Sequence, residues 1–506
     1  MSEGSPIVPA SREVLLRPDK ALVRGQLTWL DRLARRHPDR ADELAEEVAA
    51  LFGSPWNGEP LERILDGLVR LAASDGPRVR DALGAVVDRR HWSWHGEHHY
   101  DPCCLCGDVV DLVAATVGMQ NPARRGRWSA LLAAVRRTAR PAAEPALATT
   151  DPRVPAPHRL LRARLAEIGH HLGVPGRPGL LAAPTSADGG LDPLALVERL
   201  AALGDTAPWH WDLSQALLRL PADADEAVAG KAEALGTPAG DRLAAWLRAG
   251  GFPQPVARVT TVERRARRSG YDWEYDSLPA QRVVVELRPP AGYDDRHGLL
   301  TVEPAPIGVG YSGWARLWPS VLPGHPGVVA AYALPGVAAT ADMDQRDGAA
   351  VLPLLAESAG PGGPALDLAL AYGLGARHGH DRVAALDALL GLAAAGRLDA
   401  AGVGGHLGRL VAGQSVKLSR AIEPLRDAAA AGAPLSVWRL LAAALPPMLA
   451  AGTPPRGLPD LLTLATETAT STGVRLDVAG LAEAAGRGGT GRVVTEARRL
   501  HRVLAG

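Results

Sequence analysis

Five glycines divide the C-terminal part of the chain into segments of helix length. From about residue 365 onward, apolar, alanine-rich segments end at glycines that lie 17 to 21 residues apart: Gly396, Gly413, Gly432, Gly452 and Gly473. That interval fits one helix of about three to four turns and a short connection. Glycine often ends a helix because it adopts the left-handed conformation at little cost. The spacing therefore predicts a succession of similar helices, each closed by a glycine C-cap.

The apolar positions inside these segments follow helical periodicity. Two sets are spaced i, i+3, i+4 and i+7: Leu386, Leu389, Leu390 and Ala393, and then Val437, Leu440, Leu441 and Ala444. Each set makes one apolar stripe, which a single helix cannot bury, so consecutive helices must stack. Two glycine intervals make a helical hairpin of the length used in HEAT-like arrays. Similar stripes recur between residues 27 and 71. The sequence thus predicts a mostly α-helical fold, a HEAT-like α-solenoid of helical hairpins.

Composition and charge narrow the class of protein. The 506 residues are 47% hydrophobic and 22% charged, which is ordinary for a globular protein. Lys+Arg and Asp+Glu are each 55, and this balance argues against a general nucleic-acid binder. The N-terminal residues lack a basic segment followed by an apolar one, and no window approaches 18 uninterrupted apolar residues. We expect a cytoplasmic protein with no membrane segment.

Breaks in the periodicity predict the organisation of the chain. Residues 253–320 contain two β-branched runs, near 256–265 and 281–290, which predict two to four short strands. An ordered β-containing insertion packed on the helices is favoured over a separate β-domain. The predicted segments are N-terminal helical repeats over 1–139 with a His/Cys-rich loop at 91–107, a Pro/Ala-rich linker over 140–158, helical repeats over 159–252, the insertion over 253–320, and C-terminal helical repeats over 321–506.

The His/Cys-rich loop carries the most specific chemical signal. It contains all three cysteines of the chain, a distribution unlike that of a secreted disulfide framework. Zinc prefers four nitrogen or sulfur ligands, and His95, His98, Cys103 and Cys106 offer them as two close pairs. Only four residues separate the pairs, so a small structural zinc clip fits better than a folded finger. The alternative, which is favoured, is an exposed loop without metal. Glu97 is the only acid inside the cluster, which argues against catalysis there.

Other motifs have simpler structural explanations. The sequence GRGGTGR at 486–492 imitates a phosphate-binding loop, but it follows a helical pattern and lacks the Lys-Ser/Thr ending, so we expect a helix–helix turn with Thr490 as N-cap. Gly373 and Gly375 more simply permit close helix approach or a kink, since no complete GxGxxG sequence is present. Arginine-rich stretches near Trp128 and at 264–275 leave a nucleic-acid interface open, although solvated helix faces and an acidic partner protein explain them equally well.

Several stretches resemble an uncharacterised bacterial family of large HEAT-like repeat proteins. They include EVLLRPDKALVRGQLTWLDRLARRHPDRADEL, LLAAPTSADGGLDPLALVERL, WPSVLPGHPGVVAAYALP, PALDLALAYGLGAR, GLPDLLTLA and AGRGGTGRVVTEARRL, which together span most of the chain. The resemblance implies an all-helical scaffold, in members often encoded beside MoxR-type AAA ATPases, von Willebrand A proteins and SWIM zinc-finger proteins. It carries over no catalytic residue. Members have a long region ahead of the stretch that begins here at Glu13. We do not expect this chain to perform whatever role that region has.

The combined expectation is a non-catalytic scaffold or adaptor. It would bind partner proteins along a helical-repeat surface, and the resemblance suggests an AAA ATPase or a von Willebrand A protein as partner, in an ATPase-linked assembly. No catalytic or cofactor-binding residue is predicted, and structural zinc is the one cofactor that the residues suggest. Two alternatives remain: a metal-dependent enzyme centred on the His/Cys cluster, and a nucleic-acid-binding solenoid.

Overall fold

The computed structural model describes residues 154–171, 180–204, 206–222, 225–263, 281–295, 297–304 and 315–506. The chain divides into two compact units, one made of Met1–Thr150 and Arg162–Pro178 and the other of Asp151–Leu161 and Gly179–Gly506. Most of the described residues belong to the second unit.

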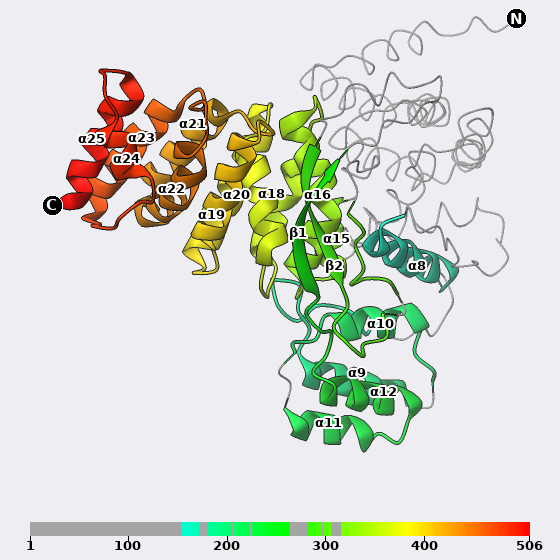
Figure 1. The fold of residues 1–506 in the computed structure, drawn as a ribbon. Helices are drawn as coiled ribbons and strands as arrows, with labels where there is room; N and C mark the ends of the chain where they lie inside the picture. Colours follow the sequence, from blue (N-terminus) through cyan, green and yellow to red (C-terminus); the bar gives the residue numbers. More distant parts are fainter. Residues whose placement is uncertain are drawn as a thin grey trace, which may run out of the picture. The chain divides into compact units, whose positions relative to one another are not determined.

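The described part is mostly α-helical, as the sequence predicts (Figure 1). None of its helices combines the length and the hydropathy needed to cross a bilayer. The elements are α8 (Ala156–His171), α9 (Pro193–Leu203), α10 (His210–Leu218), α11 (Glu226–Glu233), α12 (Pro238–Arg248), β1 (Val256–Glu263), β2 (Gln281–Arg288), α15 (Trp318–Val321), α16 (Pro326–Asp342), the 3₁₀-helix η3 (Gly348–Val351), α17 (Leu352–Glu357), α18 (Gly363–Leu374), α19 (Gly379–Ala394), α20 (Ala400–Ala412), α21 (Leu418–Ala430), α22 (Pro434–Leu449), α23 (Leu458–Thr472), α24 (Leu481–Gly486) and α25 (Arg492–Ala505).

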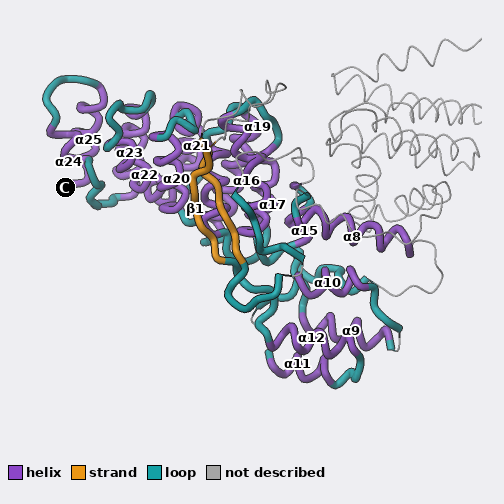
Figure 2. Tube along the Cα trace, turned by 45° about the vertical axis from the view of Figure 1, so that its right-hand side comes forward, coloured by secondary structure: helices purple, strands orange, loops and turns teal. Residues whose placement is uncertain are grey.

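Helices α16 to α25 stack on alternate neighbours. Helices α16, α18, α20 and α22 pack successively against one another, and we call them the first row. The second row, α17, α19, α21, α23 and α25, packs in the same alternating way. Figures 1 and 2 show these helices following one another in a single direction toward the C-terminus. Every helix therefore covers part of the apolar stripe of the helix two positions later.

The two predicted strands form an antiparallel pair against the first row. Val256 lies opposite Arg288 and Glu263 opposite Gln281, while Leu287 makes a further bridge to Val302. The pair contacts α16 and α18 (orange in Figure 2). From Ala365 to Leu374 every residue of α18 is buried, because α16, α20, α19 and the strands surround it.

Two polar anchors fix β2 to these helices. Arg282 forms a bidentate ion pair with Asp342 at the end of α16, with nitrogen–oxygen distances of 2.8 and 2.6 Å, and the two side chains are only 1% and 4% exposed. Burial raises the pKa of Asp342, and Arg282 opposes that rise. The Tyr372 hydroxyl accepts from the backbone N–H of Val283 and donates to its carbonyl. These bonds satisfy backbone groups of β2 on the side away from β1.

Helix α20 approaches α22 closely because two of its residues are glycines. A Cβ atom at Gly404 would lie 2.0 Å from the carbonyl oxygen of Leu440, and one at Gly408 would lie 2.5 Å from that of Ala444. No residue with a side chain fits at those distances without displacing α22. A similar reason holds at Gly373 and Gly375, where an added Cβ would meet side chains at 2.8 and 2.2 Å. The structure thus confirms that the last two glycines permit close approach.

A second helical group lies within α9 to α12. Its core is built from leucines and alanines of all four helices, including Leu196, Leu213, Ala232 and Leu243. These helices lie within the segment 159–252 that the sequence predicts to be helical. Helix α8 begins at Ala156, so residues 156–158 of the predicted linker are helical.

The predicted left-handed glycines are confirmed at three positions, Gly413 is the C-cap of α20 without being left-handed, and the prediction is wrong at Gly452. Gly396, Gly432 and Gly473 have positive φ angles of 66°, 104° and 68°. Gly413 has φ −81° because the chain turns left-handed one residue later, at Gln414, with φ 60°. Gly452 does not adopt the left-handed conformation.

The turn at Gln414 keeps the same hydrogen bonds as the glycine turns. Ser415 N–H donates to Leu410 O, just as Arg397 N–H donates to Leu392 O after Gly396. This bond pattern defines the turn, so it outweighs the cost of roughly 1–2 kcal/mol that a left-handed residue other than glycine incurs. The predicted helix–helix turn at 486–492 is also present, but the N-cap of α25 is Gly491 rather than Thr490.

Candidate functional site

The four predicted zinc ligands, His95, His98, Cys103 and Cys106, lie outside the described residues, as do both arginine-rich stretches. Within the described ranges, no group of three or more His, Cys, Asp or Glu side chains is placed to hold a metal ion. Polar side chains gather instead at the turns between the two rows of helices. One set of turns connects first-row to second-row helices, and the other connects second-row to first-row helices.

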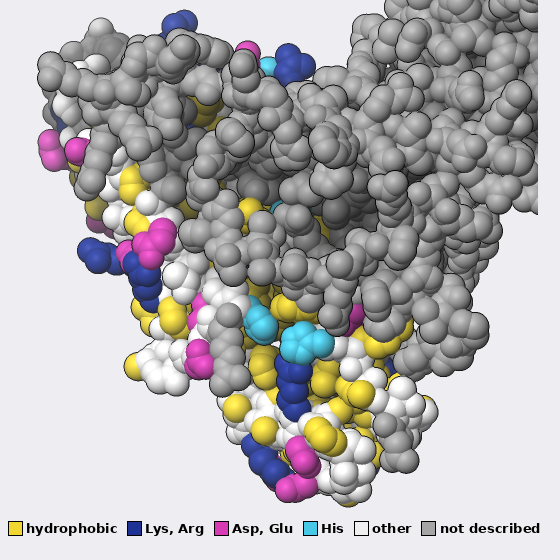
Figure 3. All heavy atoms as spheres, turned by 90° about the vertical axis from the view of Figure 1, so that its right-hand side faces the viewer, with side chains coloured by type: hydrophobic (Ala, Val, Ile, Leu, Met, Phe, Trp, Pro, Cys, Tyr) yellow, Lys and Arg dark blue, Asp and Glu magenta, His cyan; other side chains and the backbone are white. Residues whose placement is uncertain are grey.

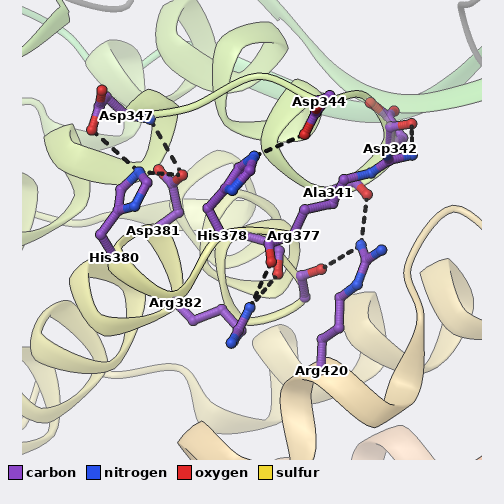
Figure 4. Close-up of polar contacts among 12 residues, drawn as sticks. Ala341, Asp342, Asp344, Asp347, Arg377, His378, His380, Asp381, Arg382 and Arg420 are labelled. Carbon is purple, nitrogen blue, oxygen red and sulfur yellow. Dashed lines mark hydrogen bonds and ion pairs between the residues drawn. The ribbon is translucent and has the colours of Figure 1, made fainter. Parts of the chain in front are cut away.

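The first set of turns carries two histidines paired with aspartates (Figure 4). His378 Nε2 lies 2.9 Å from Asp344 Oδ1, and His380 Nε2 lies 3.3 Å from Asp347 Oδ1. The two imidazole rings stack, with centroids 5.8 Å apart. Asp381, which is buried, accepts from the backbone N–H of Asp347 and Ala349 and so holds the start of η3.

Three arginines at these turns bind backbone carbonyls. Arg420 of α21 donates to Ala341 O at 3.0 Å and to Gly375 O at 3.5 Å, at the ends of α16 and α18. Arg382 donates to Ala376 O and Arg377 O, and Arg377 donates to Asp342 O. Figure 4 shows Arg382 and Arg420 pointing at these carbonyls. Burial, followed by Arg377 and Arg382, lowers the pKa of Arg420. The cationic groups thus complete helix C-termini, where backbone acceptors otherwise lack partners.

A structural role accounts for this arrangement better than a catalytic one. A histidine that activates a nucleophile contacts a hydroxyl or thiol. The hydrogen-bond and ion-pair partners that the described residues give His378 and His380 are carboxylates. We therefore assign this cluster to holding successive turns together.

The opposite set of turns contains a pair of carboxylates at the start of α20. Asp399 is the N-cap, and its Oδ1 accepts from Gly402 N–H at 2.8 Å. A Cβ atom at Gly402 would lie 2.6 Å from Asp399 Oδ2 and 2.9 Å from Asp367 Oδ2. The two carboxylates, one from α18 and one from α20, therefore face the same point, and the glycine leaves the room that they occupy.

Burial governs the protonation of Asp367. The residue is 8% exposed, and no described residue donates a hydrogen bond to its carboxyl group. Burial and the neighbouring charge of Asp399 raise the pKa of Asp367 to about 7. Both causes disfavour the charged carboxylate. The pair therefore holds a proton through most of the acidic range.

His406 extends this polar group along α20. It is 5% exposed, and burial followed by Arg409 lowers its pKa to about 4, against the opposing charge of Asp399. Arg409 Nη2 lies 2.9 Å from His406 Nδ1. Because a guanidinium can only donate, Nδ1 is the acceptor and the neutral ring carries its proton on Nε2. Arg409 is thereby engaged with the histidine rather than with the carboxylate pair.

The sequence reasoning did not single out Asp367, Asp399 or His406. The sequence did contain a signal, because Asp367 interrupts the apolar run PALDLALAYGLG. A charged residue inside such a run is rarely buried unless it has a partner. Its partner Asp399 lies at the start of the next first-row helix, and only the packing of α18 on α20 brings the two together.

Three successive helices of the second row carry exposed acidic side chains. They are Asp387 in α19, Glu423 and Asp427 in α21, and Glu467 in α23, with Arg426 among them. The last helix of the row, α25, instead exposes arginines. In the view of Figure 3, the described acidic, basic and apolar side chains are interspersed. The acidic feature is therefore repeated over α19, α21 and α23.

No protein-family model matches the chain, and no curated protein or solved structure shows significant similarity to it.

Proposed function

We propose that the protein is a non-catalytic scaffold or adaptor, a HEAT-like solenoid that binds a partner protein along its second row of helices. The observation that carries the proposal is the series of exposed carboxylates on α19, α21 and α23. Repeats that stack on their neighbours create an extended surface, and each repeat adds a side chain at a regular interval. Charges repeated in this way steer a partner of the opposite sign and fix its register.

The partner that suits this surface is a protein with a basic face. The family resemblance suggests an AAA ATPase or a von Willebrand A protein, and hence an ATPase-linked assembly. The charge balance of the chain and the engagement of Arg377, Arg382 and Arg420 with backbone carbonyls favour a protein partner over a nucleic acid. We propose the cytoplasm as the compartment, because the three clustered cysteines are unlike a secreted disulfide framework and suit a reducing environment.

A charge-removal experiment tests the proposal. The triple variant Asp387→Asn, Glu423→Gln, Glu467→Gln removes one carboxylate from each of the three helices. Binding to the AAA ATPase and the von Willebrand A protein from the same organism is measured by biolayer interferometry at two salt concentrations. We expect the wild type to bind with an affinity that falls as salt rises, and the variant to bind at least about tenfold more weakly.

The matched control removes three exposed carboxylates elsewhere, with Glu198→Gln, Asp241→Asn and Asp477→Asn. It carries the same change in net charge and is expected to bind as the wild type does. Equal weakening in both triple variants would assign the effect to net charge and contradict a specific surface. Absence of binding by the wild type to either protein would remove both as partners.

A further inference from the structure

The carboxyl group of Asp367 has no donor among the described residues. Each of its oxygens can accept hydrogen bonds, yet none of those residues supplies one. The residue is 8% exposed and neither oxygen is fully enclosed, so a donor group from solution can reach them. Since Asp399 Oδ2 faces the same point above Gly402, the pair lacks a donor group that could bind both carboxylates at once.

Among the described residues, no cation is bonded to the pair. The groups that act on its two helices are Asp367 on α18 and Asp399, His406 and Arg409 on α20. Arg397, in the same turn as Asp399, donates instead to the backbone carbonyls of Ala356 and Ser358. His406 is neutral near pH 7, and Arg409 donates to its Nδ1. The exposed Asp399 leaves one side of the pair open to solvent.

We propose that Asp367 and Asp399 form a binding site for an arginine side chain of a partner protein, at the turn between α19 and α20. A guanidinium group is planar and has five N–H donors, so it can bridge carboxylates that come from two different helices. The ligand is thus a guanidinium group in an otherwise unspecified protein segment. The site is separate from the acidic surface of the second row, and it rests on the proposed function only in that a protein supplies the arginine.

Binding of the guanidinium displaces a proton. Just below neutral pH the free pair holds a proton on Asp367, because burial and Asp399 raise its pKa. A bound cation favours the ionised carboxylate, so the proton leaves Asp367 for the buffer as the guanidinium takes its place. The O–H bond of Asp367 breaks and the proton bonds to a buffer base, and no other covalent bond changes.

Isothermal titration calorimetry of the full-length chain with the peptide Ac-Gly-Arg-Gly-NH₂ tests the site. Titrations just below neutral pH in two buffers of different ionisation enthalpy report the number of protons released. We expect millimolar binding by the wild type with release approaching one proton. The neutral analogue, with citrulline in place of arginine, is expected not to bind, and the lysine peptide to bind more weakly because its ammonium lacks the planar fork.

Two conservative variants locate the effect. Asp367→Asn is expected to weaken binding at least about tenfold and to abolish proton release. Asp399→Asn is expected to weaken binding similarly, while its amide oxygen retains the N-cap bond to Gly402. Asp477→Asn serves as the control, and cooperative unfolding of each variant by circular dichroism confirms that it is folded.

Unchanged affinity in Asp367→Asn, equal binding of the citrulline peptide, or absence of wild-type binding would overturn the site. In the last case, the pair would be a proton-sharing element alone. The triple variant at Asp387, Glu423 and Glu467 is expected to bind the peptide normally, so failure of the acidic surface and failure of this site are distinguishable.

Discussion

Helix α20 has two opposite sides that are built on different principles. Toward α22, Gly404 and Gly408 bring backbone against backbone, with no room for an added atom. Toward α18, the carboxyl groups of Asp367 and Asp399 share a space and one of them has no donor. Close packing on the glycine side stabilises the folded protein, whereas the buried charge of Asp367 on the carboxylate side destabilises it. The contrast shows that one helix can be packed for stability on one side and carry hydrogen-bond acceptors without donors on the other.

The largest expected effect comes from filling the glycine side. Gly404→Ala places a Cβ atom 2.0 Å from the carbonyl oxygen of Leu440, so α20 and α22 must separate. We expect the free energy of unfolding to fall by about 3 kcal/mol, as for overpacked cores. Urea denaturation measures the change.

Gly405→Ala is the matched control, because a Cβ there meets nothing within 4 Å. Alanine has the higher helix propensity, so we expect a gain of about 0.5–1 kcal/mol. Equal losses in both variants would show that α20 does not depend on close approach to α22.

Removing the buried charge on the other side should stabilise the protein. The pKa of Asp367 is about 7 in the folded protein and about 3.9 in an unfolded chain, so the folded state binds the proton more tightly. Stability is then fully present below about pH 4, declines as the pH rises to about 7, and stays level above. We expect Asp367→Asn to gain on the order of 2 kcal/mol at pH 8 and little at pH 4. Urea denaturation across this range measures it, and a pH-independent difference would contradict the assignment.

His406 is expected to act in the opposite direction. Its pKa is about 4 in the folded protein and about 6.5 in an unfolded chain, so the unfolded state binds the proton more tightly. Its contribution is complete above about pH 6.5 and is lost as the pH falls toward 4. We expect His406→Gln to reduce this acid-side loss by on the order of 1 kcal/mol at pH 4. In the same series, the His406→Gln, Asp367→Asn double variant should lose both contributions, and its remaining slope should come from other shifted groups such as Asp342. A difference between His406→Gln and the wild type that does not vary with pH would contradict the assignment.

The smallest effect separates the two roles of Asp399. Asp399→Ala removes the N-cap bond to Gly402 and should cost about 1 kcal/mol. Asp399→Asn keeps the cap, removes the charge beside Asp367, and should be neutral or slightly stabilising above pH 7. Thermal unfolding of the two variants compares them. If both lose the same stability, the charge rather than the cap is what α20 requires.

The sequence predicted the helices because their signals are local. The stripes at Leu386 and Val437 depend on spacing within one helix, and both lie in helices, α19 and α22. The strands near 256 and 281 were recognisable from β-branched residues in the same way. Left-handed residues were predicted less well, since Gln414 took the place of Gly413 through hydrogen bonds that depend on the whole turn.

The candidate site was not predicted because it depends on packing between helices. Asp367 and Asp399 each have unremarkable neighbours in the chain, and only the fit of α18 on α20 makes one of them buried and unpartnered. The carbonyl contacts of Arg420 were missed for a similar reason, since an arginine on a helix usually indicates a solvated face. The zinc site at His95, His98, Cys103 and Cys106 stays a prediction, which elemental analysis of the wild type and a Cys103→Ser, Cys106→Ser variant can test.

Arg420 also bears on how the array comes apart. In a stack of repeats that contact only adjacent repeats, each boundary opens with its own free energy, and unfolding proceeds inward from the ends. By reaching from α21 to the carbonyls that end α16 and α18, Arg420 links a second-row helix to two successive first-row helices. Opening any boundary between them then requires breaking the same bonds. We therefore expect the helices from α16 to α21 to open together, and α20 to depend in addition on its close packing against α22.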